Sequence, residues 1–240
     1  MTIPALAPLF KGPLEPFADA LTLGPIENAR PGADLLDRAV LRELIERLAP
    51  NYGDGDRRAV ASIWSKSHFS TLMPSALAAN LLLDIDLPIA IDRVGIVSDD
   101  MGRTEQIVLE HAGEPLSAGL AEHRFDDLIE AHVAPLIAAL ASVSGASTKV
   151  FWSNAGNVFD YVVRETRRLA ASTTGSDAGL ALMAKRRKAG RPNPLYATVS
   201  YPPGGGRIRR VCCLRYLAPN ISYCGTCPIA PQAASRHQAR

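Results

Sequence analysis

The sequence of 240 residues has no cysteine before position 212, and its four cysteines all lie between residues 212 and 227. This distribution argues against a disulfide framework, and a chain of this length can bury a core without one. No apolar run approaches the length of about 18 residues that a membrane-spanning helix needs. The proline-rich start carries no basic cluster, so it does not resemble a secretory signal peptide. These absences predict a soluble protein of a reducing compartment, which we expect to be the cytoplasm.

The sequence also lacks the common motifs of nucleotide-binding and metal-binding sites. It has no G-x-G-x2-G and no G-x4-G-K-[ST] pattern, and Gly204–Gly206 is more typical of a hairpin turn than of a phosphate-binding loop. Its 5 histidines include no H-x3-H or H-E-x2-H pair. We therefore expect no built-in nicotinamide or flavin site. Any redox activity would need an external electron donor, such as a ferredoxin or a flavin- or NAD(P)H-dependent reductase.

Charge is distributed unevenly, although the net charge of the whole chain is only +2. Residues 1–159 contain 12 Lys and Arg against 21 Asp and Glu, whereas residues 160–240 contain 14 against 3. A basic C-terminal third can attract nucleic acid, an anionic membrane surface or an acidic protein, and it can equally be a solvated surface. No nucleic-acid binding is predicted, because the aromatic residues do not interleave with the arginines as stacking platforms would.

The spacing of apolar residues predicts a mostly helical α+β fold. One helix is expected to start near Thr148, and the others are expected over residues 34–50, 56–73, 75–83, 125–140 and 177–188. Alternating apolar residues predict two β-hairpins, formed by residues 88–100 with 103–110 and by residues 193–201 with 206–214. The two hairpins are candidates for one shared antiparallel sheet.

Prolines and charged residues set the expected ends of these helices. Asp34 can cap the first helix and Pro50 ends it, while Pro74 separates the second helix from the third. Pro135 should bend the helix that contains it. The basic run Lys185–Lys188 is expected in the last turn of a helix, where cations are favoured.

Composition divides the chain into three parts. Residues 1–33 are rich in proline and glycine and predict an extended leader over the surface. Residues 34–206 form a mixed helical and β body, and residues 207–240 form a C-terminal segment that carries the cysteines. The second strand of the second hairpin leads directly into Cys212 and Cys213.

The cysteines Cys212, Cys213, Cys224 and Cys227 follow the spacing C-C-x10-C-x2-C. Four thiolates can hold a structural zinc ion, usually as two C-x2-C pairs. Adjacent thiolates are awkward ligands for a single tetrahedral ion because their side chains tend to diverge. A two-iron cluster relaxes that demand, since four thiolates are shared between two metals. The spacing favours iron–sulfur and leaves structural zinc and a disulfide framework open as alternatives.

The segment RRVCCLRYLAPNISYCGTCPI resembles the C-terminal signature of the FhuF-type ferric siderophore reductases. Upstream, DRRAVASIWSKSHFSTLMP resembles the first conserved block of that family. The stretches HRFDDLIEAHVAPLIAAL and STKVFWSNAGNVFDY resemble its central block. The resemblance covers residues 56–227 and is most specific at the cysteines.

This resemblance implies a [2Fe–2S] cluster held by Cys212, Cys213, Cys224 and Cys227. It also implies reduction of Fe(III) in a hydroxamate-type siderophore complex. Such a cluster passes one electron, and reduction of Fe(III) to Fe(II) needs one. Hydroxamate oxygens are hard donors that hold Fe(III) better than Fe(II), so reduction loosens the complex. The alternative is a non-catalytic siderophore-binding or iron-handover protein with a structural zinc ion on the same cysteines.

Three arginines flank the first cysteine pair. Positive charge from Arg209, Arg210 and Arg215 would favour the reduced state of a cluster and raise its potential, although these residues can also simply solvate a strand edge. An acidic electron donor would suit the basic C-terminal third. Peripheral contact with an anionic inner membrane is a second use of the same charge.

Other candidate contacts lie in the conserved helical blocks. Trp64 and His68 share one helix face, and together with Lys66 they could touch a siderophore, with core packing as the alternative. Trp152 and Asn154 are candidates for ligand contacts or for buried hydrogen bonds.

Overall fold

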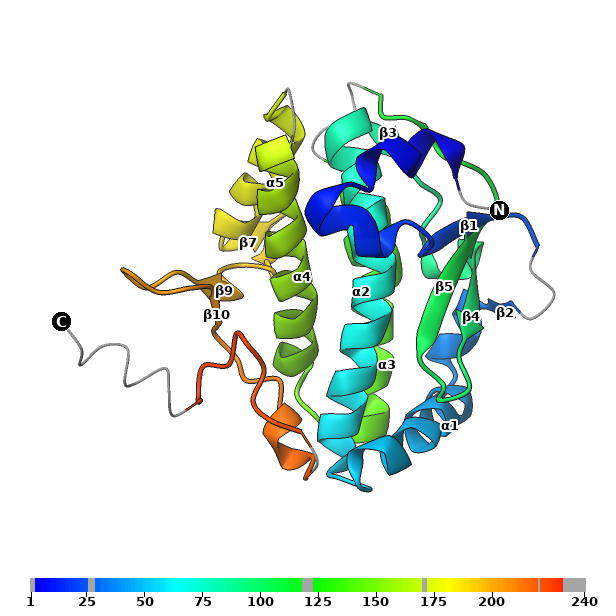
Figure 1. Ribbon diagram of the computed structural model, residues 1–240, viewed down its shortest axis with the longest axis vertical. Coiled ribbons are helices and arrows are strands. Elements are labelled where there is room, and N and C mark those ends of the chain that lie inside the picture. Colours follow the sequence, from blue (N-terminus) through cyan, green and yellow to red (C-terminus); the bar gives the residue numbers. More distant parts are fainter. Residues whose placement is uncertain (1–2, 26–28, 118–122, 170–171, 220, 231–240) are drawn as a thin grey trace.

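The computed structural model describes residues 3–25, 29–117, 123–169, 172–219 and 221–230 of the chain. Two long helices, α2 (Arg57–Leu83) and α4 (Thr148–Leu169), run side by side through the middle of the molecule (Figure 1). In this view a small sheet lies on one side of the pair, and the C-terminal hairpin with the cysteine segment lies on the other.

The remaining helices pack around this central pair. α1 spans Arg38–Leu48, α3 spans Ala134–Ser144 and α5 spans Thr174–Ala184. A π-helical stretch, Asp127–Val133, leads directly into α3. The prediction of a predominantly helical α+β fold is confirmed, and so is the start of α4 at Thr148.

α2 is a single helix of 27 residues, whereas the sequence predicts two helices separated at Pro74. That prediction is wrong. Proline removes one backbone donor from a helix interior, but here the helix is buried on both sides of the defect. Leu72 and Leu77 are 0% and 1% exposed, so tertiary packing holds the turns around Pro74 together. Asp56 caps the first turn, and Asp84 ends the helix in the left-handed conformation with φ 48°.

The main sheet has four strands in the order β1–β5–β4–β2. β4 (Val94–Ser98) and β5 (Thr104–Leu109) are antiparallel neighbours, which confirms the first predicted hairpin with shorter strands than expected. β1 (Leu21–Leu23) runs parallel to β5, and β2 (Arg30–Pro31) pairs antiparallel with β4.

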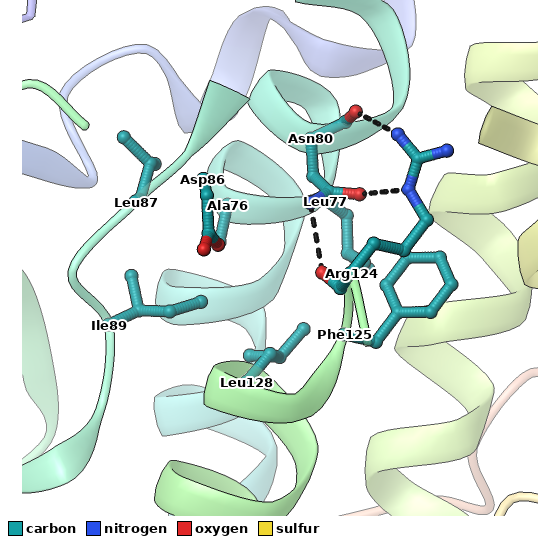
Figure 2. A pocket seen from close by; sticks show the side chains of 9 residues that line it. All are labelled: Ala76, Leu77, Asn80, Asp86, Leu87, Ile89, Arg124, Phe125 and Leu128. Atoms are coloured by element: carbon teal, nitrogen blue, oxygen red, sulfur yellow. Dashed lines mark hydrogen bonds between the residues drawn. The ribbon is translucent and has the colours of Figure 1, made fainter. Parts of the chain in front are cut away.

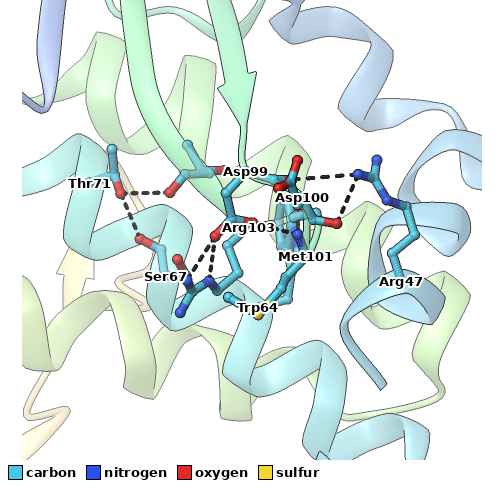
Figure 3. Close-up of polar contacts among 10 residues, drawn as sticks. Arg47, Trp64, Ser67, Thr71, Asp99, Asp100, Met101 and Arg103 are labelled. Carbon is cyan, nitrogen blue, oxygen red and sulfur yellow. Dashed lines mark hydrogen bonds and ion pairs between the residues drawn. The ribbon is translucent and has the colours of Figure 1, made fainter. Parts of the chain in front are cut away.

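The turn of this hairpin is held by side chains and by glycine. Asp99 accepts a hydrogen bond from the Arg103 backbone N–H at 2.9 Å, and Gly102 adopts φ 78°, which favours glycine. Arg47 of α1 donates to the Asp100 carbonyl at 3.1 Å (Figure 3). The turn is therefore fastened to a helix that is distant from it in the sequence.

The second predicted hairpin exists, but it does not share a sheet with the first. β9 (Val199–Ser200) and β10 (Ile208–Arg209) form a separate two-stranded sheet, so the expectation of one shared sheet is wrong. The backbone N–H of Arg209 donates to the Thr226 carbonyl at 2.9 Å. The free edge of β10 is thus occupied by the loop between Cys224 and Cys227, here called the cysteine loop. This edge is therefore not available to the main sheet.

The basic run after α5 forms a strand and not a helix end. α5 stops at Ala184, and β7 (Arg187–Lys188) pairs with β8 (Arg191–Pro192). The Asn193 amide donates to the carbonyls of Leu182 and Lys185 at 2.7 and 2.8 Å. These bonds satisfy the carbonyls at the helix end and replace the helical continuation that the sequence predicts.

Residues 3–25 and 29–33 do not form an extended leader. They contain two 3-10 helices, Pro4–Leu9 and Gly12–Phe17, followed by the edge strands β1 and β2. Leu6 and Leu14 are 1% and 0% exposed, so this region contributes to the core. The prediction failed because the prolines of this region lie at the start of 3-10 helices. A 3-10 helix has three residues per turn, so apolar side chains a few residues apart can point into the core. The division of the whole chain into three domains stays a prediction.

Two smaller expectations about helix ends are also corrected. Asp37, not Asp34, caps α1, and its carboxylate accepts from the Ala39 N–H at 2.7 Å. Asp34 lies one turn earlier, in the 3-10 helix Gly32–Leu36. Pro135 lies in the first turn of α3, where a missing N–H is tolerated, and the irregular π-helical turns precede it.

The stretch Asp127–Ser144 is long and apolar enough to cross a membrane by length and composition. Half of it is buried inside the protein, and α3 contacts both α1 and α4. This packing is typical of a core helix in a globular fold.

A buried arginine joins the C-terminal end of α2 to the start of the π-helical stretch. Arg124 is 7% exposed, and it donates to the Asn80 side chain and carbonyl at 2.9 and 2.8 Å (Figure 2). The Asn80 amide donates back to the Arg124 carbonyl at 2.9 Å. The space beside them, about 10 Å³, is no larger than a water molecule needs, so this pocket is structural.

The remaining short elements are β3 (Ile85–Asp86), which pairs with β6 (Glu114–Pro115), and the 3-10 helices Ala49–Tyr52, Ile91–Arg93 and Arg215–Leu217.

Candidate metal centre

The cysteine segment docks on the polar parts of α2 and α4. The Ser62 hydroxyl of α2 donates to the Cys213 carbonyl at 2.7 Å. The Ser153 hydroxyl of α4 donates to the Val211 carbonyl at 2.9 Å. Both serines are buried, so the backbone around the first cysteine pair is held by two helices that are far from it in the sequence.

The four cysteines are free thiols, and two of their sulfurs lie close together. Cys213 Sγ lies 3.6 Å from Cys224 Sγ. Burial raises the pKa of Cys212, and the neighbouring Cys213 and Cys227 add to that shift. The observed sulfur pair therefore joins one cysteine of the vicinal C-C motif to one cysteine of the C-x2-C motif.

The observed sulfur separation fits a metal site. Two thiolates on one tetrahedral metal at about 2.3 Å lie about 3.8 Å apart, close to the 3.6 Å between Cys213 and Cys224. Each iron of a [2Fe–2S] cluster takes two protein thiolates, so this pair can hold one of the two irons. The same separation also suits two ligands of a zinc ion.

Lys66 brings a positive charge to the cluster ligands. Its ammonium lies 2.8 Å from Cys213 Sγ. Hydrogen bonding between the Cys213 and Cys224 sulfurs, together with the Lys66 charge, lowers the pKa of Cys213 to about 4. The same hydrogen bond raises the pKa of Cys224. Cys213 is thus held as a thiolate, which is the form that binds metal.

Backbone donors also point at these sulfurs. The Leu214 N–H donates to Cys212 Sγ at 3.4 Å, and the Arg215 N–H helps to lower the pKa of Cys213. Leu214 adopts φ 57°, an uncommon conformation for a residue with a side chain. The turn after the vicinal pair therefore bends tightly and presents consecutive N–H groups to the two sulfurs.

Arg209 lies behind the cysteines and is 5% exposed. Its guanidinium donates to Thr226 Oγ1 at 2.9 Å, to the Ser153 carbonyl at 3.4 Å and to Asn154 Oδ1. Burial lowers the pKa of Arg209, and the charges of Cys213 and Cys224 oppose that shift. Arg209 therefore supports the loop between Cys224 and Cys227 from within.

Asn154 connects this arginine to α2. Its amide group donates to Ser62 Oγ and Ser65 Oγ, both at 2.9 Å, while its oxygen accepts from Arg209. Asn154 is 0% exposed, so it makes buried hydrogen bonds and does not contact a ligand. The sequence did not predict roles for Ser62, Ser65, Ser153 and Thr226. α2 also contains Ser67, Ser70 and Ser75, so serine spacing on this helix does not single out Ser62 and Ser65.

The structure excludes direct substrate contact for two of the predicted residues. Trp64 and His68 are both 0% exposed and stack on each other with ring centroids 5.4 Å apart. The Trp64 indole donates to the Gly102 carbonyl at 2.7 Å, beside the hairpin turn that Figure 3 shows. The prediction of siderophore contact is therefore wrong for both residues, because α2 turns this face into the core.

His68 forms a buried pair with His132, which lies in the π-helical stretch Asp127–Val133. Their Nε2 atoms are 3.0 Å apart. Their Nδ1 atoms contact the Thr104 hydroxyl at 2.9 Å and the Ile89 carbonyl at 2.6 Å, respectively. Burial lowers the pKa of His68 well below its usual value and that of His132 to about 4. Both rings are neutral in the folded protein at neutral pH.

The remaining predicted residues, Trp152, Arg210 and Arg215, differ in their burial and in their contacts. Trp152 is half-buried and packs against the hydrophobic core. Arg210 is exposed, and its backbone N–H donates to the Thr198 carbonyl at 2.9 Å. The Arg215 side chain is half-buried, and its Nε has no hydrogen-bond partner among the described residues. Of the three arginines, only Arg209 is linked to the cysteine loop by its guanidinium.

Comparison with known families gives two matches. The model described as a ferric iron reductase FhuF-like transporter matches residues 62–204, and the FhuF 2Fe-2S C-terminal domain matches residues 209–228. The second match contains all four cysteines. The cofactor of this segment is accordingly a [2Fe–2S] cluster.

Individual proteins are also similar to the chain. The ferric siderophore reductase of Escherichia coli (strain K12) is 25% identical over 179 residues, which cover 72% of this chain and 67% of that protein.

Among solved structures, the aerobactin synthetase IucA from a hypervirulent pathotype of Klebsiella pneumoniae superposes with a TM-score of 0.51 and 12% identity. The superposition covers 62% of this chain and 31% of the synthetase. The chain thus spans about a third of that enzyme, and the likeness concerns the fold alone.

Proposed function

The chain belongs to the FhuF family of ferric iron reductases, and on this premise we propose that it is a cytoplasmic ferric siderophore reductase that acts on a hydroxamate-type complex. The substrate would be Fe(III) held by siderophore oxygens. The product would be Fe(II), which hard oxygen donors hold less well. Iron would then pass to other ligands in the cell.

The observation that carries this proposal is the close approach of the Cys213 and Cys224 sulfurs beside the positive charge of Lys66. When bound, the [2Fe–2S] cluster supplies a one-electron carrier. Cys213 and Cys224 would hold one iron, which would leave Cys212 and Cys227 for the other. Lys66 supplies an ammonium to the Cys213 sulfur at 2.8 Å. Positive charge and N–H donors at cluster sulfurs favour the more negative, reduced state and raise its potential.

The proposed reaction needs neither a general acid nor a general base among the side chains. The chain has to hold the ferric complex near the cysteine loop, set the potential, and receive electrons from outside. We propose an acidic one-electron donor, such as a ferredoxin or a flavin- or NAD(P)H-dependent reductase. The 14 basic and 3 acidic residues in positions 160–240 support this choice. The same excess of basic residues supports a further proposal, that the protein binds peripherally to an anionic membrane surface.

One experiment tests the function directly. The protein is purified anaerobically, and its iron and acid-labile sulfide are measured together with its electron paramagnetic resonance spectrum after dithionite reduction. The reduced protein is then mixed with a ferric trihydroxamate, and Fe(II) is counted with a ferrous chelator. We expect two irons and two sulfides per chain and one Fe(II) per reduced cluster.

The alternative function gives a different result in the same experiment. A colourless protein with one zinc ion and no sulfide would support an iron-handover role in place of a reductase. A protein that has the cluster but does not reduce the ferric complex would refute the proposed substrate, and the cofactor would stand.

A further inference from the structure

A hollow of about 300 Å³ opens directly beside the cysteine loop. α4 contributes Arg164 and Arg168, the second hairpin contributes Tyr201 and Arg207, and the cysteine loop contributes Gly225 and Thr226. Gly225 and Thr226 lie between Cys224 and Cys227, so one wall of the hollow is the loop that carries two cluster ligands. A volume of this size is at the lower end of what small-molecule sites occupy.

Aromatic and guanidinium groups are stacked in the walls of this hollow. The Arg164 guanidinium lies over the Tyr201 ring at 4.2 Å, and the Arg207 guanidinium lies over the Tyr161 ring at 5.0 Å. Tyr201 is 45% exposed although it is a large aromatic side chain. Stacking orients the guanidinium groups without using up their five N–H donors. Part of this donor capacity is used within the protein, because Arg168 donates to Glu165 at 2.6 Å and Arg207 lies 3.9 Å from Asp160. The walls thus combine flat aromatic surfaces with guanidinium groups that keep some of their N–H donors.

The hollow carries net positive charge. Three guanidinium groups and one carboxylate, that of Glu165, line it. A second carboxylate, Asp160, lies beneath and is 1% exposed. Asp160 accepts from Arg164 Nε at 3.0 Å and from the Tyr201 hydroxyl. Asp160 therefore holds Arg164 and Tyr201 in place, and the three arginines exceed the two carboxylates by one positive charge.

Glycine keeps the hollow open at two points. A Cβ atom added to Gly206 or to Gly225 would meet nothing within 4 Å, and neither glycine has a positive φ. The backbone conformation therefore does not require glycine at these positions. A larger side chain would project into empty space next to the hollow.

We propose that this hollow binds the ferric complex, and that the preferred complex is an anionic, oxygen-ligated ferric siderophore, such as a hydroxamate carrying free carboxylates. This inference rests on the proposed function and adds where the substrate binds and which charge it carries. Arg164, Arg168 and Arg207 donate to the outer oxygens of the complex, and the tyrosine rings contact its apolar parts.

Reduction in this position is a balanced one-electron step. One electron passes from the reduced cluster to Fe(III), which gives Fe(II) and the oxidised cluster. An external one-electron donor, a ferredoxin or a flavoprotein, then restores the reduced cluster. No bond to the protein forms or breaks. Gly225 and Thr226, which line the hollow, are the residues between Cys224 and Cys227, so a complex bound there would lie beside the loop that carries two of the proposed cluster ligands.

The test measures binding separately from reduction. Gallium(III) has the charge of Fe(III) but is not reduced, so gallium complexes report binding to the oxidised holoprotein by calorimetry. The two probes are a gallium complex of a carboxylate-bearing dihydroxamate, which is anionic, and a gallium complex of a trihydroxamate without carboxylates. We expect the anionic probe to bind more tightly, and added salt to weaken it.

Two variants with matched controls locate the site. Gly206→Leu should weaken binding of the anionic probe by about 10-fold or more, whereas Gly206→Ala should have a small effect because it fills little of the hollow. Arg168→Gln should weaken it by about 3- to 10-fold, and Arg42→Gln, which removes the same charge from exposed α1, should not. The visible spectrum and the reduction potential should stay those of the parent protein in all four variants.

The outcomes separate this inference from the proposed function. Parent-like binding in both Gly206→Leu and Arg168→Gln, with reduction of ferric complexes intact, would overturn the site while the reductase stands. Equal affinity for the two probes would overturn the charge preference. No reduction of any ferric complex by the parent protein would refute the function itself.

Discussion

The helical body and the cysteine segment are built in different ways. In the body, Trp64, Phe69, Phe151 and Phe159 are all 0% exposed, and α2 and α4 bury apolar side chains against each other. In the segment, Tyr216, Tyr223 and Ile229 are 42%, 43% and 48% exposed, and the regular structure within residues 207–219 and 221–230 consists of β10 and one 3-10 turn.

This contrast shows which interactions hold each region. Apolar burial drives folding of the body and needs no metal. The segment is fixed by hydrogen bonds from Ser62, Ser153 and Arg209 and by the cysteines themselves. A net hydrogen bond contributes only about 1 kcal/mol, so metal binding should supply much of the order in the segment.

The largest expected effect is that of Cys213→Ser, which should abolish the function of the cysteine segment and leave the helical body folded. Cys213→Ser removes the sulfur that Lys66 contacts and one of the four proposed cluster ligands, and Cys212 is itself one of the other three. We expect loss or distortion of the cluster and loss of ferric-complex reduction. Far-ultraviolet circular dichroism should keep the helical signal of the parent, because the body does not depend on metal. Full iron content with full activity would contradict the assignment of Cys213 as a ligand.

Arg209→Met tests whether the buried polar network holds the segment to the body. It leaves Asn154 Oδ1 and Thr226 Oγ1 without their donor, and such a loss costs about 2–4 kcal/mol. Hydrogen exchange should increase over residues 207–230 more than over α2.

The control for this variant is Arg210→Met, in which an exposed arginine is lost, and it should exchange like the parent. Uniform protection in both variants would mean that the segment is held by something other than this network.

The body of the protein was more accessible to sequence reasoning than the segment. Helical spacing located α1 and α4, and alternation with a turn located β4 and β5. The pattern failed at Pro74, because long-range packing against α4 and the 3-10 helices outweighs a local proline signal. It also failed for the shared sheet, because the cysteine loop occupies the edge of β10, and no local pattern records such a pairing.

At the candidate site, spacing and resemblance identified the four cysteines, and they could not give the pairing of the sulfurs. Lys66 lies 147 residues from Cys213 in the chain, so its contact depends on the docking of the segment on α2. The hollow beside Gly225 combines α4 with two loops and left no signal in the sequence. Trp64 and His68 share a helix face that the sequence left open to ligand contact or core packing, and both side chains are buried in the core.

The buried histidine pair should make the body, and not the segment, sensitive to acid. The folded pKa of His132 is about 4 and that of His68 is also lowered, while an unfolded histidine titrates near its usual value of 6.5. The unfolded state therefore binds more protons, so stability is complete above about pH 6.5 and falls as the pH drops toward 4. For His132 alone the loss approaches about 3 kcal/mol at pH 4.

Urea unfolding of the metal-free protein between pH 7 and pH 5 checks this expectation. The exposed His111 is the matched control, and His111→Gln should leave the slope of stability against pH unchanged. His132→Leu should flatten that slope even if it lowers stability at every pH. A stability that does not change between pH 7 and pH 5 would mean that the pair binds a proton in the folded state.

The smallest effect concerns Lys66, a side chain of the body whose ammonium contacts a proposed cluster ligand. Lys66→Gln removes the positive charge 2.8 Å from Cys213 Sγ and keeps a hydrogen-bond donor of similar length. Because a positive charge stabilises the reduced cluster, the potential should fall by about 60 mV, the equivalent of a tenfold change for one electron. Spectroelectrochemical titration measures this shift, and Lys66→Arg should restore most of it. If neither variant moves the potential, the body contributes only a scaffold to the cluster, and its tuning lies wholly within the cysteine segment.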